Sequence, residues 1–173
     1  MVYYDDGKVL IRDMTESDGK IFVEEERAQG WDSDTEKFEM RISHRKEGKA
    51  VLFTAEYEGA PAGYVSVYPY DAGGPFKDTK IPEIVDFNVL EKYRRKGIGS
   101  RLMDAAEKTA AEYSDIVCIG VGLHSGYGSA QRMYIKRGYI PDGSGVWYKG
   151  EVCGQYAPCC NDDDLVLYMS KSV

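Results

Sequence analysis

The chain has 173 residues, of which 43% are hydrophobic and 29% charged, so it is long enough and apolar enough to bury a globular core. No apolar run reaches the length of a membrane span, and the first residues lack the features of a secretion signal, which together predict a cytoplasmic protein with no membrane partner. The net charge of −7 disfavours nucleic acid as a partner and favours a cationic or neutral one. We expect one domain over residues 1–173.

The first third of the chain predicts one strand and two helices. Residues 9–11 are β-rich, and Thr15-Glu16-Ser17-Asp18 has the pattern of a capping box for a helix that runs to about Gly30. Ser33-Asp34-Thr35-Glu36 repeats this pattern and predicts a second helix through about Lys46.

Three β-rich runs follow, and a basic glycine turn comes after the third. Residues 50–57 and 62–70 flank Glu58-Gly59-Ala60-Pro61 and predict a hairpin, and residues 84–89 predict another strand. The turn is Arg94-Arg95-Lys96-Gly97-Ile98-Gly99-Ser100, and apolar residues recur at helical spacing from Ile98 onward. The turn therefore joins a strand to the N-terminus of a helix.

This basic turn has the features of a pyrophosphate site. The first N–H groups of a helix lack internal partners, and the helix dipole adds roughly half a positive charge there. Gly97 and Gly99 are expected to let an anion approach the backbone without meeting a Cβ atom. In a chain that is acidic overall, five cations surround the turn, namely Lys92, Arg94, Arg95, Lys96 and Arg101.

The last third predicts a buried strand, a short helix and two more strands. Residues 116–121 form a continuous apolar run, which is typical of a strand covered on both faces. A helix is expected from Ser129 to about Arg137, with Gly138 as its C-terminal cap. The two further strands are expected near residues 146–149 and 165–170.

Two motifs and this order of elements resemble the GNAT superfamily of N-acetyltransferases. Arg94-x-x-Gly97-x-Gly99 is similar to its acyl-CoA motif, usually written Gln/Arg-x-x-Gly-x-Gly/Ala. Ala130-x-x-x-Tyr134-x-x-x-Gly138-Tyr139 is similar to its second signature. The order of elements over about residues 8–170 is also that of the GNAT fold. The resemblance implies an α/β fold with a mixed, largely antiparallel sheet flanked by about four helices.

The resemblance further implies transfer of an acetyl group from acetyl-CoA to a primary amine, by direct attack in a ternary complex. In the family, the backbone of the strand before the turn binds pantetheine, which corresponds here to Asn88, Val89 and Leu90. The turn itself, Arg94, Arg95, Lys96, Gly97, Ile98, Gly99 and Ser100, would hold the pyrophosphate. Tyr127 stands where the family often has Asn, so Ser129 is expected to supply that contact to pantetheine.

Two residues are the candidates for proton transfer. Tyr134 matches the family tyrosine that protonates the leaving thiolate, although a core tyrosine is the alternative in a chain with 14 tyrosines. An alkylammonium with a pKa of about 10.4 must lose a proton before it attacks. Glu83 lies fourteen residues before Gly97, which is the spacing of the general base in the histone acetyltransferase branch. Asp86 and a water molecule are the competitors, and a solvated carboxylate is the plain alternative for either acid.

Strict strand alternation places Glu83, Val85 and Phe87 on one face and Asp86 and Asn88 on the other. A β-bulge, which is common in this strand of the family, would change that assignment.

Other functions remain open on sequence grounds. A non-catalytic acyl-CoA sensor would need neither Tyr134 nor an acid near Glu83, and a pure interaction module would not bind CoA.

Polyamines, aminoglycosides, amino acids and protein N-termini are all candidate acceptors, and the run Asp162-Asp163-Asp164 favours a cationic one. A homodimer is also open. No metal is expected, because metal-ligand spacing is absent from the four cysteines, Cys118, Cys153, Cys159 and Cys160.

Overall fold

The computed structural model describes residues 1–173 and divides into two compact units. The first unit comprises Met1–Tyr68 and Ile84–Thr109, and the second comprises Pro69–Glu83 and Ala110–Val173. None of the helices has the length and apolar character that a membrane crossing requires. The elements in chain order are β1 (Val2–Asp5), β2 (Val9–Asp13), α1 (Glu16–Ala28), α2 (Thr35–Lys46), β3 (Val51–Tyr57), β4 (Ala60–Tyr68), β5 (Glu83–Val89), α3 (Ile98–Ala110), β6 (Ile116–Gly122), α4 (Gly128–Lys136), β7 (Ile140–Tyr148), β8 (Glu151–Val152) and β9 (Leu165–Ser172).

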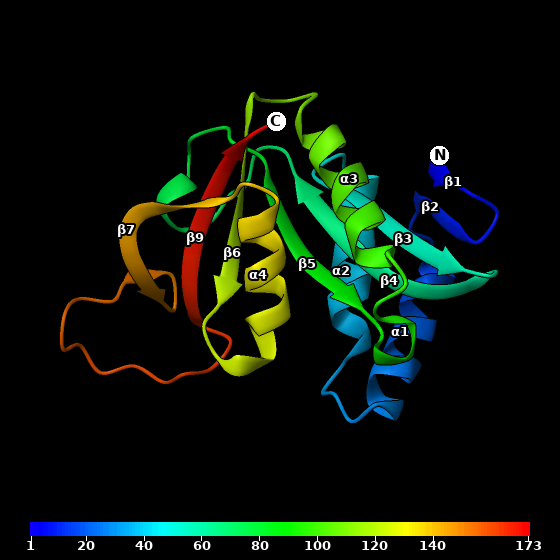
Figure 1. Ribbon diagram of the computed structural model, residues 1–173, viewed down its shortest axis with the longest axis horizontal. Helices are drawn as coiled ribbons and strands as arrows, with labels where there is room; N and C mark the ends of the chain where they lie inside the picture. Colours follow the sequence, from blue (N-terminus) through cyan, green and yellow to red (C-terminus); the bar gives the residue numbers. More distant parts are fainter. The chain divides into compact units, whose positions relative to one another are not determined.

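In the first unit, neighbouring strands follow the order β1-β2-β3-β4-β5, and β1 to β4 pair antiparallel. The expected hairpin between β3 and β4 is confirmed, with a turn formed by Glu58 (φ +50°) and Gly59 (φ +84°). Two positive φ angles in a two-residue loop match the twist of the strands that it joins. Figure 1 shows α3 on one face of these strands and α1 and α2 on the other.

The α1/α2 face, which is the face of the strands that α1 and α2 cover, is apolar. Its buried cluster takes residues from both helices and from the strands beneath them: Met14, Phe22, Val23, Phe38, Ile42, Ala50, Leu52, Tyr64, Tyr68 and Leu90. On the other face, the expected stripe of α3 is buried at Ile98, Leu102, Ala105, Ala106 and Thr109. The strands of this unit are therefore covered on both faces. Because helices pack on both of its sides, β5 is held in place.

The helix starts are fixed by acidic side chains. The capping box of α1 is confirmed, with the Thr15 N–H donating to Asp18 Oδ2 at 2.7 Å. The cap of α2 differs from the expectation by one residue, because Asp34 accepts from the Lys37 N–H at 2.8 Å. Ser33 instead donates its hydroxyl to the buried Glu26 carboxylate at 2.6 Å.

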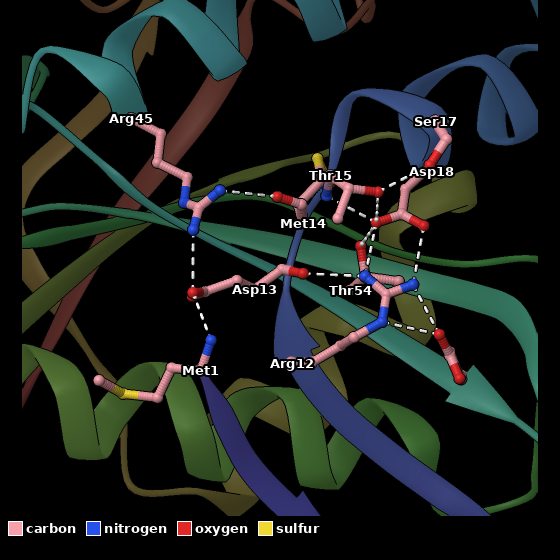
Figure 2. Close-up of polar contacts among 10 residues, drawn as sticks. Met1, Arg12, Asp13, Met14, Thr15, Ser17, Asp18, Arg45 and Thr54 are labelled. Atoms are coloured by element: carbon pink, nitrogen blue, oxygen red, sulfur yellow. Dashed lines mark hydrogen bonds and ion pairs between the residues drawn. The ribbon is translucent and has the colours of Figure 1, made fainter.

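Figure 2 shows how a charged cluster ties β2 to the start of α1. The Arg12 guanidinium donates to both Asp18 oxygens at 2.7 and 2.8 Å and also pairs with Glu56 at 2.6 Å. Burial alone would raise the pKa of Asp18, but the hydrogen bonds from Arg12 and Thr15 outweigh it and hold that pKa below its usual value. Nearby, Arg45 of α2 pairs with Asp13 at 2.9 Å.

In the second unit, neighbouring strands follow the order β6-β9-β7-β8, and all three pairs are antiparallel. The predicted apolar strand is β6, where Val117, Cys118, Ile119 and Val121 are buried. The predicted short helix is α4, and Gly138 follows its end at φ +91°. The edge strands β1 and β8 were not expected, because they are short and lack an apolar alternation.

Candidate functional site

The turn between β5 and α3 exposes the backbone of a helix N-terminus. The first hydrogen bond of α3 joins the Arg101 N–H to the Gly97 carbonyl at 3.2 Å, so the N–H groups of Ile98, Gly99 and Ser100 have no acceptor within the helix. The backbone turns through Arg95 at φ +61° and Gly97 at φ +81°. This geometry fits the expected anion site, because amides and helix dipole point to one exposed place.

The two glycines of this turn have different roles. At Gly97 the positive φ requires glycine, and an added Cβ would meet nothing within 4 Å. At Gly99 an added Cβ would lie 2.9 Å from Phe87 Cζ and 3.6 Å from Val89 Cγ2. Gly99 therefore allows α3 to pack closely on β5, and the expectation that it also makes room for an anion stays a prediction.

The five cations around the turn are not equally available. Lys92 is turned away, because its ammonium pairs with Glu25 at 2.5 Å. Arg95 makes no ion pair and is exposed. Aromatic rings support the other three, with Arg94 5.4 Å from the Trp31 ring, Lys96 4.7 Å from the Tyr57 ring and Arg101 4.5 Å from the Tyr4 ring. Arg94 and Arg101 also have acidic neighbours, Glu91 and Asp104, each 3.7 Å away. Four cations thus remain beside the turn, and of these Arg95 and Lys96 make no ion pair.

The strand before the turn differs along its length in how its backbone is already bonded. The Leu90 N–H donates to the Ala62 carbonyl at 2.9 Å, and the Leu90 carbonyl accepts from the Tyr93 N–H at 2.9 Å. The Val89 carbonyl accepts from the exposed Arg94 Nε at 3.2 Å. The expected pantetheine contacts of Asn88, Val89 and Leu90 stay predictions, and the Leu90 N–H is the group already engaged within the protein.

Sequence reasoning missed two residues that fix β5 from the α1/α2 face. Glu26 of α1 is 2% exposed, and its carboxylate accepts from Asn88 Nδ2 at 2.9 Å and from Tyr64 Oη at 2.5 Å. Arg41 of α2 pairs through Nε with Asp86 Oδ2 at 2.6 Å. Helical spacing could have placed both residues on the buried faces of their helices, because Glu26 lies four residues after the buried Phe22 and Arg41 lies three residues after the buried Phe38.

Glu83, the expected base, is buried in the second unit with 7% of its surface exposed. Its Oε2 accepts from the Gly73 N–H at 2.8 Å. Burial, together with the Glu83 carboxylate, raises the pKa of Tyr168 to about 12 and also raises the pKa of Cys118. Asp86, the other candidate base, forms an ion pair with Arg41. Of the two acids, Asp86 is therefore the one held in an ion pair with a guanidinium.

Tyr134, the expected acid, lies on α4 and is 4% exposed, with its ring centroid 5.8 Å from that of Tyr139. Burial raises the pKa of Tyr134, and Tyr127 adds to the shift, so the phenol stays protonated at neutral pH. Ser129 is exposed in the first turn of α4.

Tyr127, which stands at the family Asn position, makes a different contact. Its hydroxyl donates to Asp163 Oδ1 at 2.9 Å, and His124 Nε2 lies 3.0 Å from the same oxygen. These contacts lower the pKa of Asp163, His124 being the larger cause. Part of the acidic run is thus already bound within the second unit. All four cysteines are free thiols, and no three His, Cys, Asp or Glu side chains are grouped to hold a metal ion.

Comparison with known proteins agrees with this geometry. The model of the acetyltransferase (GNAT) family matches residues 11–139. An N-alpha-acetyltransferase of Sulfurisphaera tokodaii is 30% identical over 104 residues. That match covers 57% of this chain and 61% of the relative, so the chain spans less than two thirds of the relative's length.

Solved structures share the fold at low identity. An acetyl transferase from Salmonella typhimurium, described as modifying the N-terminal serine of ribosomal protein L7/L12, aligns with a TM-score of 0.70 at 14% identity, over 100% of this chain and 99% of its own. The putative acetyltransferase yncA of Salmonella typhimurium, solved with its cofactor acetyl-CoA, aligns with a TM-score of 0.67 at 14% identity, over 96% and 94%. The family model spans most of the chain and includes the basic turn and both signatures. The protein therefore belongs to the acetyltransferase (GNAT) family.

Proposed function

We propose that the protein transfers an acetyl group from acetyl-CoA to a primary amine by direct attack in a ternary complex. The observation that carries this proposal is the exposed turn at the start of α3, where unpaired amides and four cations meet in a chain of net charge −7. Membership of the acetyltransferase family and the acetyl-CoA complex of the fold relative yncA support acetyl-CoA as the donor.

The proposed donor site uses residues on both sides of the turn. The N–H groups of Ile98, Gly99 and Ser100 would bind the pyrophosphate, with Arg95 as the nearest unpaired cation. The backbone of Asn88 and Val89 would hold pantetheine, and Ser129 is proposed as a further contact from α4. Acetyl-CoA supplies a thioester, whose carbonyl carbon the amine attacks.

Glu83 is the proposed general base. An acceptor ammonium must lose its proton before attack, and a carboxylate close to the acceptor can take that proton directly or through water. The Arg41 ion pair argues against Asp86, and the Gly73 N–H holds Glu83 in place.

Tyr134 is the proposed general acid. The bond between the acetyl carbon and sulfur breaks as the amine adds, and the departing thiolate gains a proton. Because burial raises the pKa of Tyr134, the phenol carries its proton at neutral pH and can donate it.

The relatives' names favour a peptide N-terminus as the acceptor. The relative from Sulfurisphaera tokodaii is named an N-alpha-acetyltransferase, and the Salmonella protein is described as acting on an N-terminal serine. An α-amine has a pKa of about 7.7–8.0, so it loses its proton more easily than a lysine side chain. We further propose that the acceptor is cationic, which predicts an apparent KM that rises with salt. Cytoplasmic location, a single domain, a homodimer and the absence of nucleic-acid, membrane and metal partners stay predictions.

A thiol-release assay with acetyl-CoA tests the proposal. The panel would contain peptides with free and blocked N-termini, polyamines, aminoglycosides and free amino acids, and the mass of each product would be measured. Thiol release with a mass gain of one acetyl group on a free amine supports the proposal. CoA binding without release for any amine would favour the sensor function instead, and no CoA binding would favour an interaction module.

A further inference from the structure

β5 contains a backbone conformation that an L-residue adopts only at a cost. Asp86 has φ +54°, in the left-handed region, although it lies within a strand. Such a conformation persists where neighbouring groups hold it, and it is common beside functional sites. Asp86 lies two residues before Asn88, where the proposed pantetheine contact begins.

The contacts of β5 show what this conformation does. Val85 packs against the α1/α2 cluster, and its neighbour Asp86 also faces α2, where it meets Arg41. Two consecutive side chains thus share one face, as in a β-bulge. Alternation then resumes, with Phe87 against Gly99 of α3 and Asn88 against Glu26 of α1. The bulge therefore sets which way the backbone of Asn88 and Val89 is presented.

Arg41 is itself firmly placed to hold this bulge. Its Nε lies 2.6 Å from Asp86 Oδ2, and the guanidinium is 20% exposed. Its Nη1 donates to the Tyr68 hydroxyl at 2.6 Å, and its Cζ lies 5.0 Å from the Tyr68 ring. His44 Nδ1 lies 2.8 Å from the same hydroxyl. The guanidinium is thus fixed from two sides, and its charge is directed at the one residue of β5 with left-handed backbone.

We propose that Arg41 is a positioning residue for acetyl-CoA. Its ion pair with Asp86 keeps β5 bulged, so that Asn88 and Val89 meet pantetheine without a prior rearrangement. The Glu26 contact fixes the strand on the far side of the bulge. This inference rests on the proposed acetyl-CoA site, and it adds a residue of α2 that would not touch the cofactor.

The test uses glycine, which takes a positive φ without help. Arg41→Met should weaken CoA binding about five- to thirtyfold, the population change that corresponds to the ordinary cost of a left-handed L-residue. Asp86→Gly should bind CoA within about twofold of the parent protein. The double variant Arg41→Met/Asp86→Gly should also bind CoA within about twofold of the parent protein. Asp86→Ala, which keeps the backbone cost and loses the ion pair, should resemble Arg41→Met.

Two quantities are measured. Calorimetry gives the CoA affinity, and steady-state kinetics shows whether a variant changes KM for acetyl-CoA or kcat. We expect KM to rise while kcat at saturation stays within about twofold, whereas a loss of folded protein would lower kcat and leave KM unchanged. Arg45→Met is the matched control, because it removes an ion pair of α2 with Asp13 and should leave CoA affinity unchanged.

The following results from these variants would overturn the positioning role of Arg41. If the parent binds CoA and Arg41→Met binds it equally well, or if Asp86→Gly does not rescue that variant, Arg41 has no positioning role. If Arg41→Met does not fold, Asp86→Ala and Asp86→Gly still test the bulge, and equal CoA affinity for both would overturn the inference. A parent protein that does not bind CoA would overturn the proposed function as well.

Discussion

Replacing Gly99 with alanine should weaken folding while leaving CoA binding nearly intact. The new Cβ would lie 2.9 Å from Phe87 Cζ, a distance at which atoms must move. Overpacking of this kind costs typically 1–3 kcal/mol. Alanine recovers up to about 1 kcal/mol over glycine in a helix, although less in the first turn. The Phe87 ring is only half-buried and can yield, so we expect a net loss of about 1 kcal/mol.

Urea unfolding measures the loss, and calorimetry measures CoA affinity on the same samples. A loss of about 1 kcal/mol corresponds to roughly 2–4 °C in Tm for a chain of this size. Adding Phe87→Leu should make the alanine less costly than it is in the parent background, because the shorter side chain vacates the ring position. CoA affinity of the Gly99→Ala variant should stay within about threefold of the parent.

Gly97→Ala is the contrasting variant. It has free space around its Cβ but a φ of +81°, so it should lower stability by about 1–2 kcal/mol through the backbone alone. It should also weaken CoA binding, because the amides after it would be reoriented. If Gly99→Ala instead lost CoA affinity at unchanged stability, Gly99 would face the anion and the packing argument would be refuted.

Three more predictions concern proton transfer and pH. Tyr134→Phe should lower kcat about ten- to a thousandfold in steady-state assays with little change in CoA affinity, and unchanged kcat would make Tyr134 a core residue. Glu83→Gln should lower kcat at saturating acetyl-CoA and neutral pH by roughly a hundredfold or more, and Asp86→Asn should lower it far less; the reverse order would identify Asp86 as the base. Because Asp18 has a depressed pKa when folded, the stability it supplies is present above its unfolded value of about 3.9 and is lost as pH falls through the folded value. Urea unfolding at pH 7 and pH 3 should show a smaller acid loss in Arg12→Gln than in the parent, and equal losses would contradict that linkage.

The fold could be predicted from sequence where the signal is local. Capping residues placed the starts of α1 and α2, and the run Glu58-Gly59-Ala60-Pro61 placed the β3–β4 hairpin. Even there, Ser33 and Asp34 carry the same local signal for the start of α2. The choice between them depends on the buried Glu26, which binds the Ser33 hydroxyl. A contact across seven residues, from α1 to the loop before α2, is not visible in a local pattern.

The candidate site was predictable in its backbone and less so in its side chains. The glycine spacing located the turn, but the role of Gly99 depends on Phe87, which only the folded strand brings near. The family pattern suggested a bulge in β5, but its place at Asp86 depends on Arg41, 45 residues earlier in the chain. Such pairings arise from tertiary packing, so spacing can place a residue on a buried helix face but does not identify its partner on β5.

The aromatic supports of the basic turn affect the entropy of ligand binding. A free lysine or arginine side chain loses up to about 2 kcal/mol of rotamer freedom when a ligand immobilises it. Lys96 and Arg101 already rest on Tyr57 and Tyr4, so part of that freedom is lost during folding and no longer opposes binding. A carboxylate would restrain a cation equally well but would cancel its charge. The neutral Tyr57 ring restrains Lys96 and leaves its full charge for a phosphate, whereas Arg101 also has the Asp104 carboxylate 3.7 Å away.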